Sequence, residues 1–249
     1  MANKDQDTFC KKMRKATKEI HTISDTLVNT KLAFGFLDDS VWADGLLVFY
    51  EIFRYLELAM IRWKHTEIGL FLINDHLLRT EAFERDLEFY LGKEWKKDYT
   101  PRSSVIKYLT RLKEIENTEE TPILLAAYIY HLYMGLLSGG IILRKKRQLV
   151  KKIWPFKSFQ TDGNNITDFG NSNIFELKRH MRDTMNKIAE KLDDATKNKL
   201  IEESKTVFAL NNEIIKSVKG AGTVLLKRVV YFVIPVILFI FAFLVPFRR

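Results

Sequence analysis

The sequence is poor in cysteine and proline, with one and five residues among 249. A single cysteine, Cys10, excludes an internal disulfide framework and suits a reducing compartment. The chain also lacks a CxxC pair, a zinc-type cluster of Cys and His, a Walker loop and a GxGxxG motif after a strand. The common signatures of zinc and nucleotide binding are therefore missing, and the length suits one domain with an appendage.

The excess of positive charge is small. The formal charge is +9, from 40 basic and 31 acidic residues. Four of these positive charges flank the C-terminal tail, at Lys227, Arg228, Arg248 and Arg249, which leaves +5 for the rest of the chain. This balance suits an acidic partner or a membrane surface better than a nucleic-acid groove, so we expect no nucleic-acid partner.

Apolar residues recur at helical spacing, and no segment alternates with period two over a useful length. The pattern predicts a helix that starts near Asp38, and Pro101 suits the first turn of another helix. Further helices are predicted at residues 80–92, 173–192 and 199–218, the first ending at a glycine cap, Gly92. The predicted fold class is therefore all-α.

The most apolar internal segment is residues 123–143, which is long enough to span a bilayer. We disfavour a membrane span because the segment carries His131 and three glycines, Gly135, Gly139 and Gly140. Glycines in a helix interior cost about 1 kcal/mol each relative to alanine. In a helical bundle such glycines allow another group to approach the helix backbone closely. The simpler alternative is that they let a second helix pack against this one through small residues.

The C-terminal residues 229–247 carry no charge and lie between two basic pairs. This pattern predicts a transmembrane helix. Residues 1–7 are polar and show no apolar core of a secretory signal, so the bulk of the chain is expected on the cytosolic side. The predicted divisions are a polar N-terminus (1–8), a helical domain (9–218), a basic linker (219–228) and a single-pass anchor (229–247).

Residues 14–25 are interpreted as one helix with a buried stripe formed by Phe9, Met13, Ala16, Ile20 and Leu27. His21 lies at the edge of this stripe, and Asp25, four residues later, can reach one of its ring nitrogens. Arg14 lies about two turns before His21 on the same face. An isolated histidine of this kind is more often a hydrogen-bonded structural residue. With a cation nearby, it also suits a flat metallated ligand with an acidic edge, such as heme.

A second pair of cations, Lys178 and Arg182, is spaced by four residues on a predicted helix. Like charges at this spacing repel each other unless an anion lies between them.

Five segments together resemble heme oxygenases of the animal, tail-anchored type: residues 16–22, 86–90, 99–101, 135–140 and 202–211. The resemblance covers residues 9–218 and the tail. It implies one α-helical domain that holds heme b between a proximal and a distal helix. It further implies a monooxygenase that cleaves heme to biliverdin, carbon monoxide and ferrous iron, with O2 and electrons from an NADPH-dependent flavin reductase. Biliverdin reductase is a further implied partner. The uncharged C-terminal segment and the polar N-terminus predict an anchor in the endoplasmic reticulum membrane with the domain on the cytosolic face, and the basic residues beyond the segment leave the mitochondrial outer membrane open.

The resemblance also implies roles for individual residues. His21 matches the proximal iron ligand, and Asp25 stands where the family commonly has the longer Glu. The match at the distal helix covers Gly135, Gly139 and Gly140, where the backbone covers the iron face. Four positions match residues that contact the heme propionates: Arg14, Tyr130, Lys178 and Arg182. Phe208 matches a residue that packs on the heme ring, and Asn211 matches a residue of the distal polar network.

Three positions depart from the family pattern. Leu136 replaces a carboxylate that orders distal water, Leu132 replaces an Arg, and Phe53 replaces a Tyr. His131 is about 140° round the helix from Leu136 and is interpreted as a poor substitute. Slow cleavage or altered regiochemistry is therefore expected. Two other interpretations remain open at this point: a heme-binding carrier or sensor of the same fold with little turnover, and a tail-anchored adaptor that binds no heme.

Overall fold

The computed structural model describes residues 8–35, 38–72, 77–117, 122–153, 163–220, 222 and 240. Within these ranges every regular element is a helix, which confirms the predicted all-α fold class for this part of the chain. The predicted C-terminal anchor, residues 229–247, lies outside the described residues apart from Ile240, so the anchor stays a prediction.

The main helices, in chain order, are α1 (Phe9–Ala16), α2 (Lys18–Gly35), α3 (Asp39–Arg62), α4 (Thr80–Leu91), α5 (Trp95–Asp98), α6 (Ser103–Glu116), α7 (Leu125–Gly135), α8 (Ile141–Ile153), α9 (Ile174–Glu190) and α10 (Asp194–Ser217). Shorter elements are η1 (Glu67–Phe71), η2 (Pro122–Leu124) and η4 (Asn165–Thr167), which are 3₁₀ turns, and η3 (Leu136–Gly140), which is a π-helical turn between α7 and α8.

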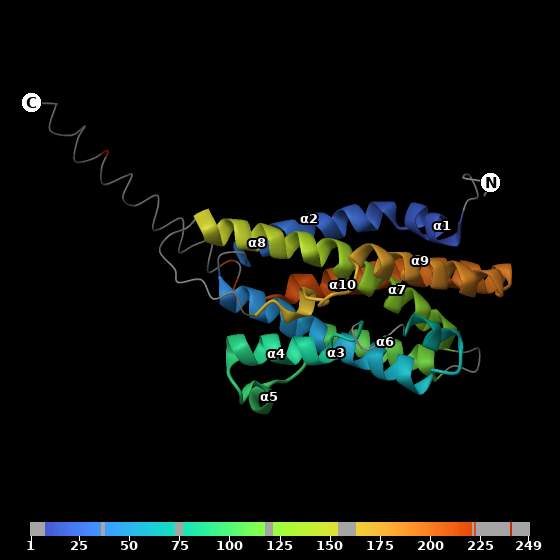
Figure 1. The fold of residues 1–249 in the computed structure, drawn as a ribbon, viewed down its shortest axis with the longest axis horizontal. Coiled ribbons are helices and arrows are strands. Elements are labelled where there is room, and N and C mark those ends of the chain that lie inside the picture. Colours follow the sequence, from blue (N-terminus) through green and yellow to red (C-terminus); the bar gives the residue numbers. More distant parts are fainter. Residues whose placement is uncertain are drawn as a thin grey trace, which may run out of the picture.

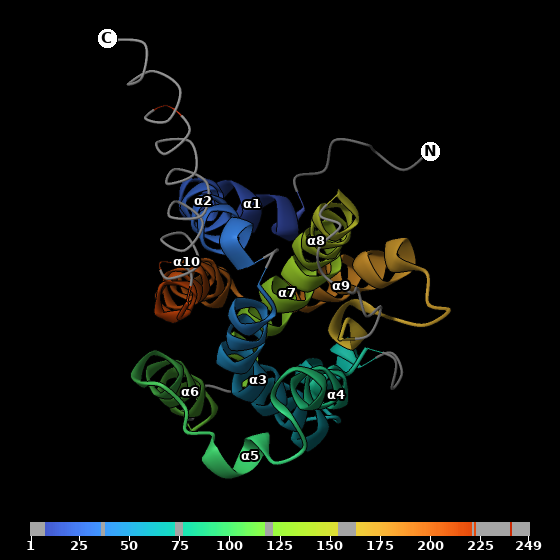
Figure 2. The ribbon, with the colours of Figure 1, turned by 90° about the vertical axis from the view of Figure 1, so that its left-hand side faces the viewer.

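Helix α7 forms the centre of the fold and contacts α3, α6, α9 and α10 (Figures 1 and 2). Eight of its residues are buried: Leu125, Ala126, Ala127, Tyr128, Ile129, Tyr130, Leu132 and Tyr133. Helix α2 lies against α10, and α1 lies against α9. The N-terminal helices therefore meet the C-terminal ones on one side of α7.

The continuous helical stretch Pro122–Leu149 is long and apolar enough to cross a membrane by length and composition alone. Half of its most apolar window is buried inside the protein, where α7 forms the core. A core helix of a soluble fold passes the same length and composition test, so the structure favours the interpretation of this segment as a core helix.

Several sequence predictions are confirmed. Asp38 caps α3 by accepting a hydrogen bond from the Ser40 backbone N–H at 2.9 Å, and α9 begins directly after its N-cap Asn173. Gly92 caps α4 with a φ of 88°, a left-handed conformation that L-residues with side chains rarely adopt.

Two helix predictions need correction. The N-terminal segment is not one helix, because it breaks at Thr17, whose hydroxyl donates to the Met13 carbonyl at 2.9 Å. Thr17 is buried, whereas Ala16, predicted in the buried stripe, is exposed. Helix α10 begins at Asp194, earlier than the predicted residue 199, because the Asp193 side chain accepts from the Thr196 N–H and caps it.

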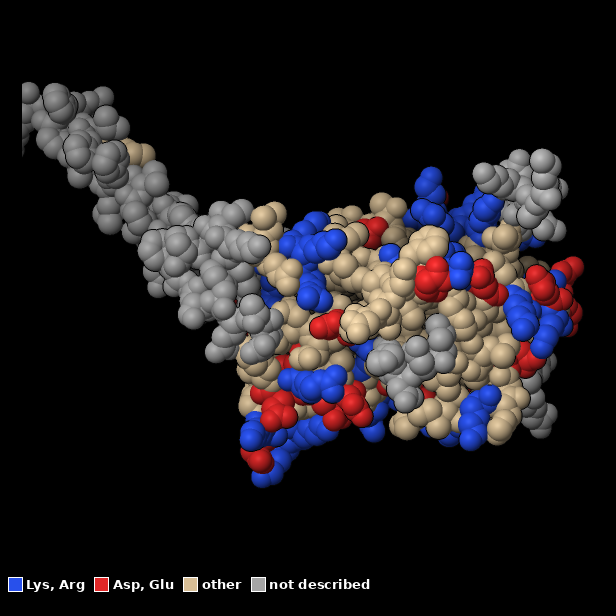
Figure 3. Space-filling view, viewed as in Figure 1, with Lys and Arg blue, Asp and Glu red and all other residues tan. Residues whose placement is uncertain are grey.

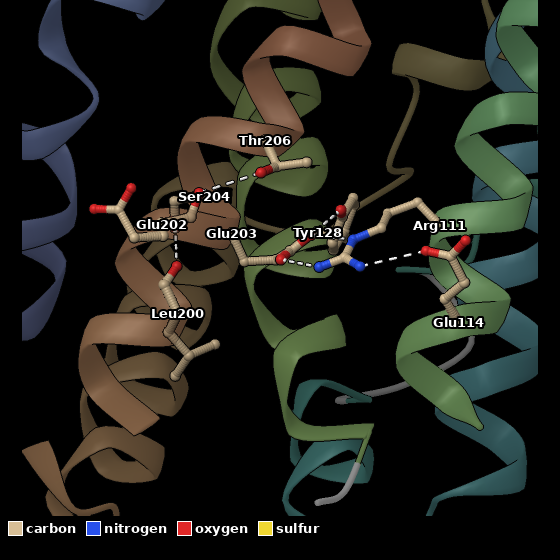
Figure 4. Close-up of polar contacts among 8 residues, drawn as sticks. All are labelled: Arg111, Glu114, Tyr128, Leu200, Glu202, Glu203, Ser204 and Thr206. Carbon is tan, nitrogen blue, oxygen red and sulfur yellow. Dashed lines mark hydrogen bonds and ion pairs between the residues drawn. The ribbon is translucent and has the colours of Figure 1, made fainter. Parts of the chain in front are cut away.

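A buried carboxylate, Glu203 on α10, joins three helices (Figure 4). The guanidinium of Arg111 on α6 donates to its two oxygens at 3.0 and 2.6 Å, and the hydroxyl of Tyr128 on α7 donates to it as well. A buried carboxylate needs such partners, since an unpaired charge in the interior is costly. Glu203 therefore fixes the position of α10 relative to α6 and α7.

We predict that Glu203→Ala lowers the free energy of unfolding by about 2–4 kcal/mol, because Arg111 and Tyr128 lose their shared acceptor. The control is Glu202→Ala, whose exposed side chain pairs with Lys205 and with no other described residue, and which should change the stability by less than about 0.5 kcal/mol. Urea unfolding followed by circular dichroism measures both. Equal stability of the two variants would show that Glu203 does not hold these helices together.

Candidate functional site

The predicted pairing of His21 with Asp25 is present on α2. His21 Nδ1 lies 3.0 Å from Asp25 Oδ2, one helical turn away, and both side chains are more than half exposed. Nδ1–H is therefore the donor, which leaves Nε2 with its lone pair and without a hydrogen-bond partner among the described residues. A carboxylate placed in this way fixes the tautomer and orientation of a metal-binding imidazole.

A phenylalanine on α10 connects this histidine to the core helix. The Phe208 ring lies edge-on to His21, with centroids 5.2 Å apart, and edge-on to His131 of α7, with centroids 5.0 Å apart. The structure thus brings Phe208 to the predicted ligand, and it adds His131 on the other side of the same ring. This contact between helices was not predicted from the sequence, in which His131 counted against a membrane span and, by its angle to Leu136, as a poor substitute for a distal carboxylate.

His131 is half-buried, and its Nε2 atom is buried without a partner among the described residues. Its ring also contacts that of Tyr130, with centroids 5.2 Å apart. Burial, with a smaller contribution from the charge of His21, lowers the pKa of His131 to about 3. The imidazole is therefore neutral at physiological pH, with one nitrogen a donor and the other an acceptor.

Of the three glycines at the end of α7 and in η3, Gly135 and Gly139 have open space around them and Gly140 does not. A methyl group added to Gly135 or to Gly139 would meet no atom of the described residues within 4 Å outside its own stretch of helix. At Gly140 it would lie 2.9 Å from Leu136 Cδ1, so this glycine accommodates a neighbouring side chain instead. The π-helical turn η3 spans this motif and was not predicted, although single π-turns inside helices are frequent at functional sites.

Positive charge gathers near one end of this site. Helix α1 carries four basic residues and no acidic one, and Figure 3 shows Lys and Arg side chains over α1 and α8. Burial, together with the neighbouring Cys10 thiol, raises the pKa of the Tyr130 hydroxyl, and the charges of Arg182 and Arg14 both lower it. Cys10 in turn donates to the Arg182 carbonyl, with the sulfur 3.6 Å from the oxygen.

The structure therefore places three of the four predicted propionate contacts together: Arg14, Tyr130 and Arg182. Lys178 lies one turn before Arg182 on α9, and no described contact places it beside Tyr130. Among the described residues no carboxylate forms an ion pair with Arg14, Lys178 or Arg182, whereas the neighbouring Arg179 pairs with Glu176. These cations remain available for an external anion.

The remaining predicted positions differ in their surroundings. Asn211 on α10 has a buried Oδ1 without a hydrogen-bond partner among the described residues. Leu132 is buried, and Leu136 is half-buried beside Gly140. Phe53 packs on Phe83 and Tyr133, with centroids 5.2 and 5.4 Å apart, so its ring belongs to the core cluster.

These residues fit a heme better than a metal ion held by protein ligands alone. No group of three or more His, Cys, Asp or Glu among the described residues is arranged to hold a metal ion. An iron that brings its own equatorial nitrogens needs only an axial imidazole, which His21 offers. The open face at Gly135 and Gly139, the unpaired Arg14 and Arg182, and the unpartnered polar atom of Asn211 suit a flat group with an anionic edge.

Comparisons with known proteins agree with this site. The family model for heme oxygenase matches residues 7–217. The chain is 30% identical to human heme oxygenase 1 over 83% of this chain and 70% of that protein, and 29% identical to heme oxygenase 2 of Synechocystis sp. over 83% and 81%. The structure of heme oxygenase-1 from Synechocystis sp. PCC 6803 in complex with heme superposes with a TM-score of 0.77 at 22% identity, covering 92% of this chain and 99% of that one. The last comparison shows the fold, and the first three show that this chain belongs to the heme oxygenase family.

Proposed function

We propose that this protein cleaves heme to biliverdin, carbon monoxide and ferrous iron, using O2 and electrons from an NADPH-dependent flavin reductase. Membership of the heme oxygenase family supports heme degradation in general. The observation that carries the proposal for this chain is the His21–Asp25 pair on α2. The Phe208 ring contacts both His21 and His131 of α7, and α7 leads into the glycines with open space around them.

In this proposal heme is the substrate and also supplies the redox-active iron. His21 binds the iron through Nε2, and Asp25 holds the imidazole in the tautomer that leaves this nitrogen free. Arg14 and Arg182 bind the propionates, because charge-assisted hydrogen bonds to carboxylates are the interactions that these unpaired cations can make. Gly135 and Gly139 allow the backbone of α7 and η3 to lie close to the opposite face of the ring.

The distal side of this site is unusually apolar. Leu136 and Leu132 offer no hydrogen-bonding group, and Phe53 packs in the core. Ordered water needs two or more polar partners, and two buried polar atoms of α7 and α10 lack a hydrogen-bond partner among the described residues, His131 Nε2 and Asn211 Oδ1. We therefore propose slow biliverdin formation, with mixed isomers, because few donors direct the reacting oxygen toward one edge of the ring.

The role of a heme carrier or sensor is less favoured, because the relatives named above are heme oxygenases. We also propose that residues 229–247 anchor the protein in the endoplasmic reticulum membrane with the helical domain in the cytosol. The support is the uncharged composition of this segment and its basic flanks. On that membrane the reductase, and biliverdin reductase after it, would meet the helical domain from the cytosolic side.

We predict that His21→Ala weakens hemin binding at least tenfold and abolishes the spectrum of an imidazole-ligated ferric heme, and that added imidazole restores it. Absorption titration with hemin measures both effects. His65→Ala is the matched control, because His65 is an exposed histidine on the turn after α3. A His21→Ala variant with an unchanged spectrum would move the ligand role to another histidine.

We predict that Leu136→Asp increases the rate of biliverdin formation and narrows the mixture of isomers, since a carboxylate can order water on the distal side. The substitution is expected to lower the stability by about 1–3 kcal/mol, because the side chain is half-buried. Single-turnover kinetics with product chromatography tests this, and Leu136→Asn separates the effect of charge from that of size. Fast, single-isomer cleavage by the unmodified protein, with no gain in Leu136→Asp, would refute this account of Leu136.

We predict that deletion of residues 229–249 releases the protein from membranes without changing its affinity for hemin, since the proposed site lies on α1, α2, α7, α9 and α10. Fractionation with a carbonate wash measures release, and the full chain is the control. A truncated protein that still sediments with washed membranes would contradict a single C-terminal anchor.

A further inference from the structure

Two imidazoles approach the same aromatic ring from different helices. His21 on α2 and His131 on α7 each lie edge-on to Phe208, at interplanar angles of 60° and 63°. Since the two centroid distances to Phe208 are 5.2 and 5.0 Å, the imidazole centroids lie no more than about 10 Å apart.

No other described histidine has these surroundings. His65 is exposed, and His180 Nε2 is 3.1 Å from the Leu70 carbonyl and 3.3 Å from the Thr184 hydroxyl, so its ring is already hydrogen-bonded. The buried Nε2 of His131 has no partner among the described residues. A neutral imidazole nitrogen that is buried without a hydrogen bond is available to a metal.

The two imidazoles belong to the two helices between which heme is proposed to lie. His21 belongs to α2, whereas His131 lies one turn before Gly135 on α7, the helix whose open glycines face the other side of the ring. With iron–nitrogen bonds of about 2.0 Å, two axial imidazoles have their centroids about 6 Å apart. Joint ligation therefore requires the His131 side chain to change rotamer and the half-buried Phe208 ring, which both imidazoles contact, to be displaced.

We propose that His131 is a second axial ligand, bound to the heme iron opposite His21 in the ferric protein. The proposal rests on the proposed function, because it needs heme at His21. It differs from the expectation based on Leu136, since His131 acts on the iron directly and not on distal water. The iron would then have both axial positions occupied by this chain.

An exchangeable second imidazole has a measurable consequence. An external ligand reaches the iron only after His131 leaves, so release of this side chain limits the rate of ligand binding. Loss of His131 frees the position without disturbing the His21–Asp25 pair, which lies on another helix.

The test compares ferric hemin complexes of the full-length protein in detergent, for the unmodified chain and for His131→Ala, His131→Gln and His65→Ala. Absorption and electron paramagnetic resonance spectra report the spin state, and stopped-flow mixing with cyanide reports the rate of ligand binding. Gln keeps a hydrogen-bonding side chain at position 131 that does not ligate heme iron as imidazole does. Using two substitutions also guards against one of them failing to fold.

We expect a six-coordinate, low-spin spectrum of two imidazoles for the unmodified chain and for His65→Ala. We expect a high-spin spectrum and cyanide binding at least tenfold faster for both His131 variants. A high-spin unmodified protein whose spectrum depends on His21, or a His131→Gln variant that stays low-spin, would overturn the second ligand and leave the proposed function standing. Failure of the unmodified protein to bind hemin at all would overturn both.

Discussion

Helix α2 carries the proposed iron ligand, but few side chains of its residues 18–31 are buried. Between residues 18 and 31 only Ser24 is buried. Its position depends on α10, where the Lys31 ammonium donates to the carbonyls of Lys216 and Val218 and the His21 ring contacts Phe208. Helix α2 packs mainly on α10 and also on α3 and α1, so its distance from α7 is set through these helices (Figure 2).

Because α2 is positioned by α10, the position of α10 also determines the position of His21. Glu203 holds α10 to α6 and α7, and so provides the fixed reference against which α2 is placed (Figure 4). The proximal side is polar and preorganised by the pair of His21 and Asp25. The distal side is formed by glycine backbone and apolar side chains, with His131 as the one imidazole described there. We therefore propose that the chain is better suited to binding heme than to directing its oxidation by ordered water.

Much of the fold and part of the site were predictable from the sequence. Helical periodicity and capping residues predicted the all-α class, and the spacing of four residues predicted the contact of His21 with Asp25, because both are local properties of a helix. The break at Thr17 was not predicted, since it depends on a side-chain hydrogen bond to the preceding turn. The contact of His131 with Phe208 joins residues 77 positions apart on separate helices, and such a contact follows from packing, which a single helix pattern does not contain.

The central claim is that heme binds between α2 and the glycine-rich turn η3. Hydrogen–deuterium exchange of the full-length protein with and without hemin tests it directly, because a ligand slows exchange at the backbone that it covers or stabilises. The account predicts slower exchange at the amides around His21 and at Leu136–Gly140, with no change in α4 and α5. Protection confined to other helices, with α2 and η3 unaffected, would contradict it.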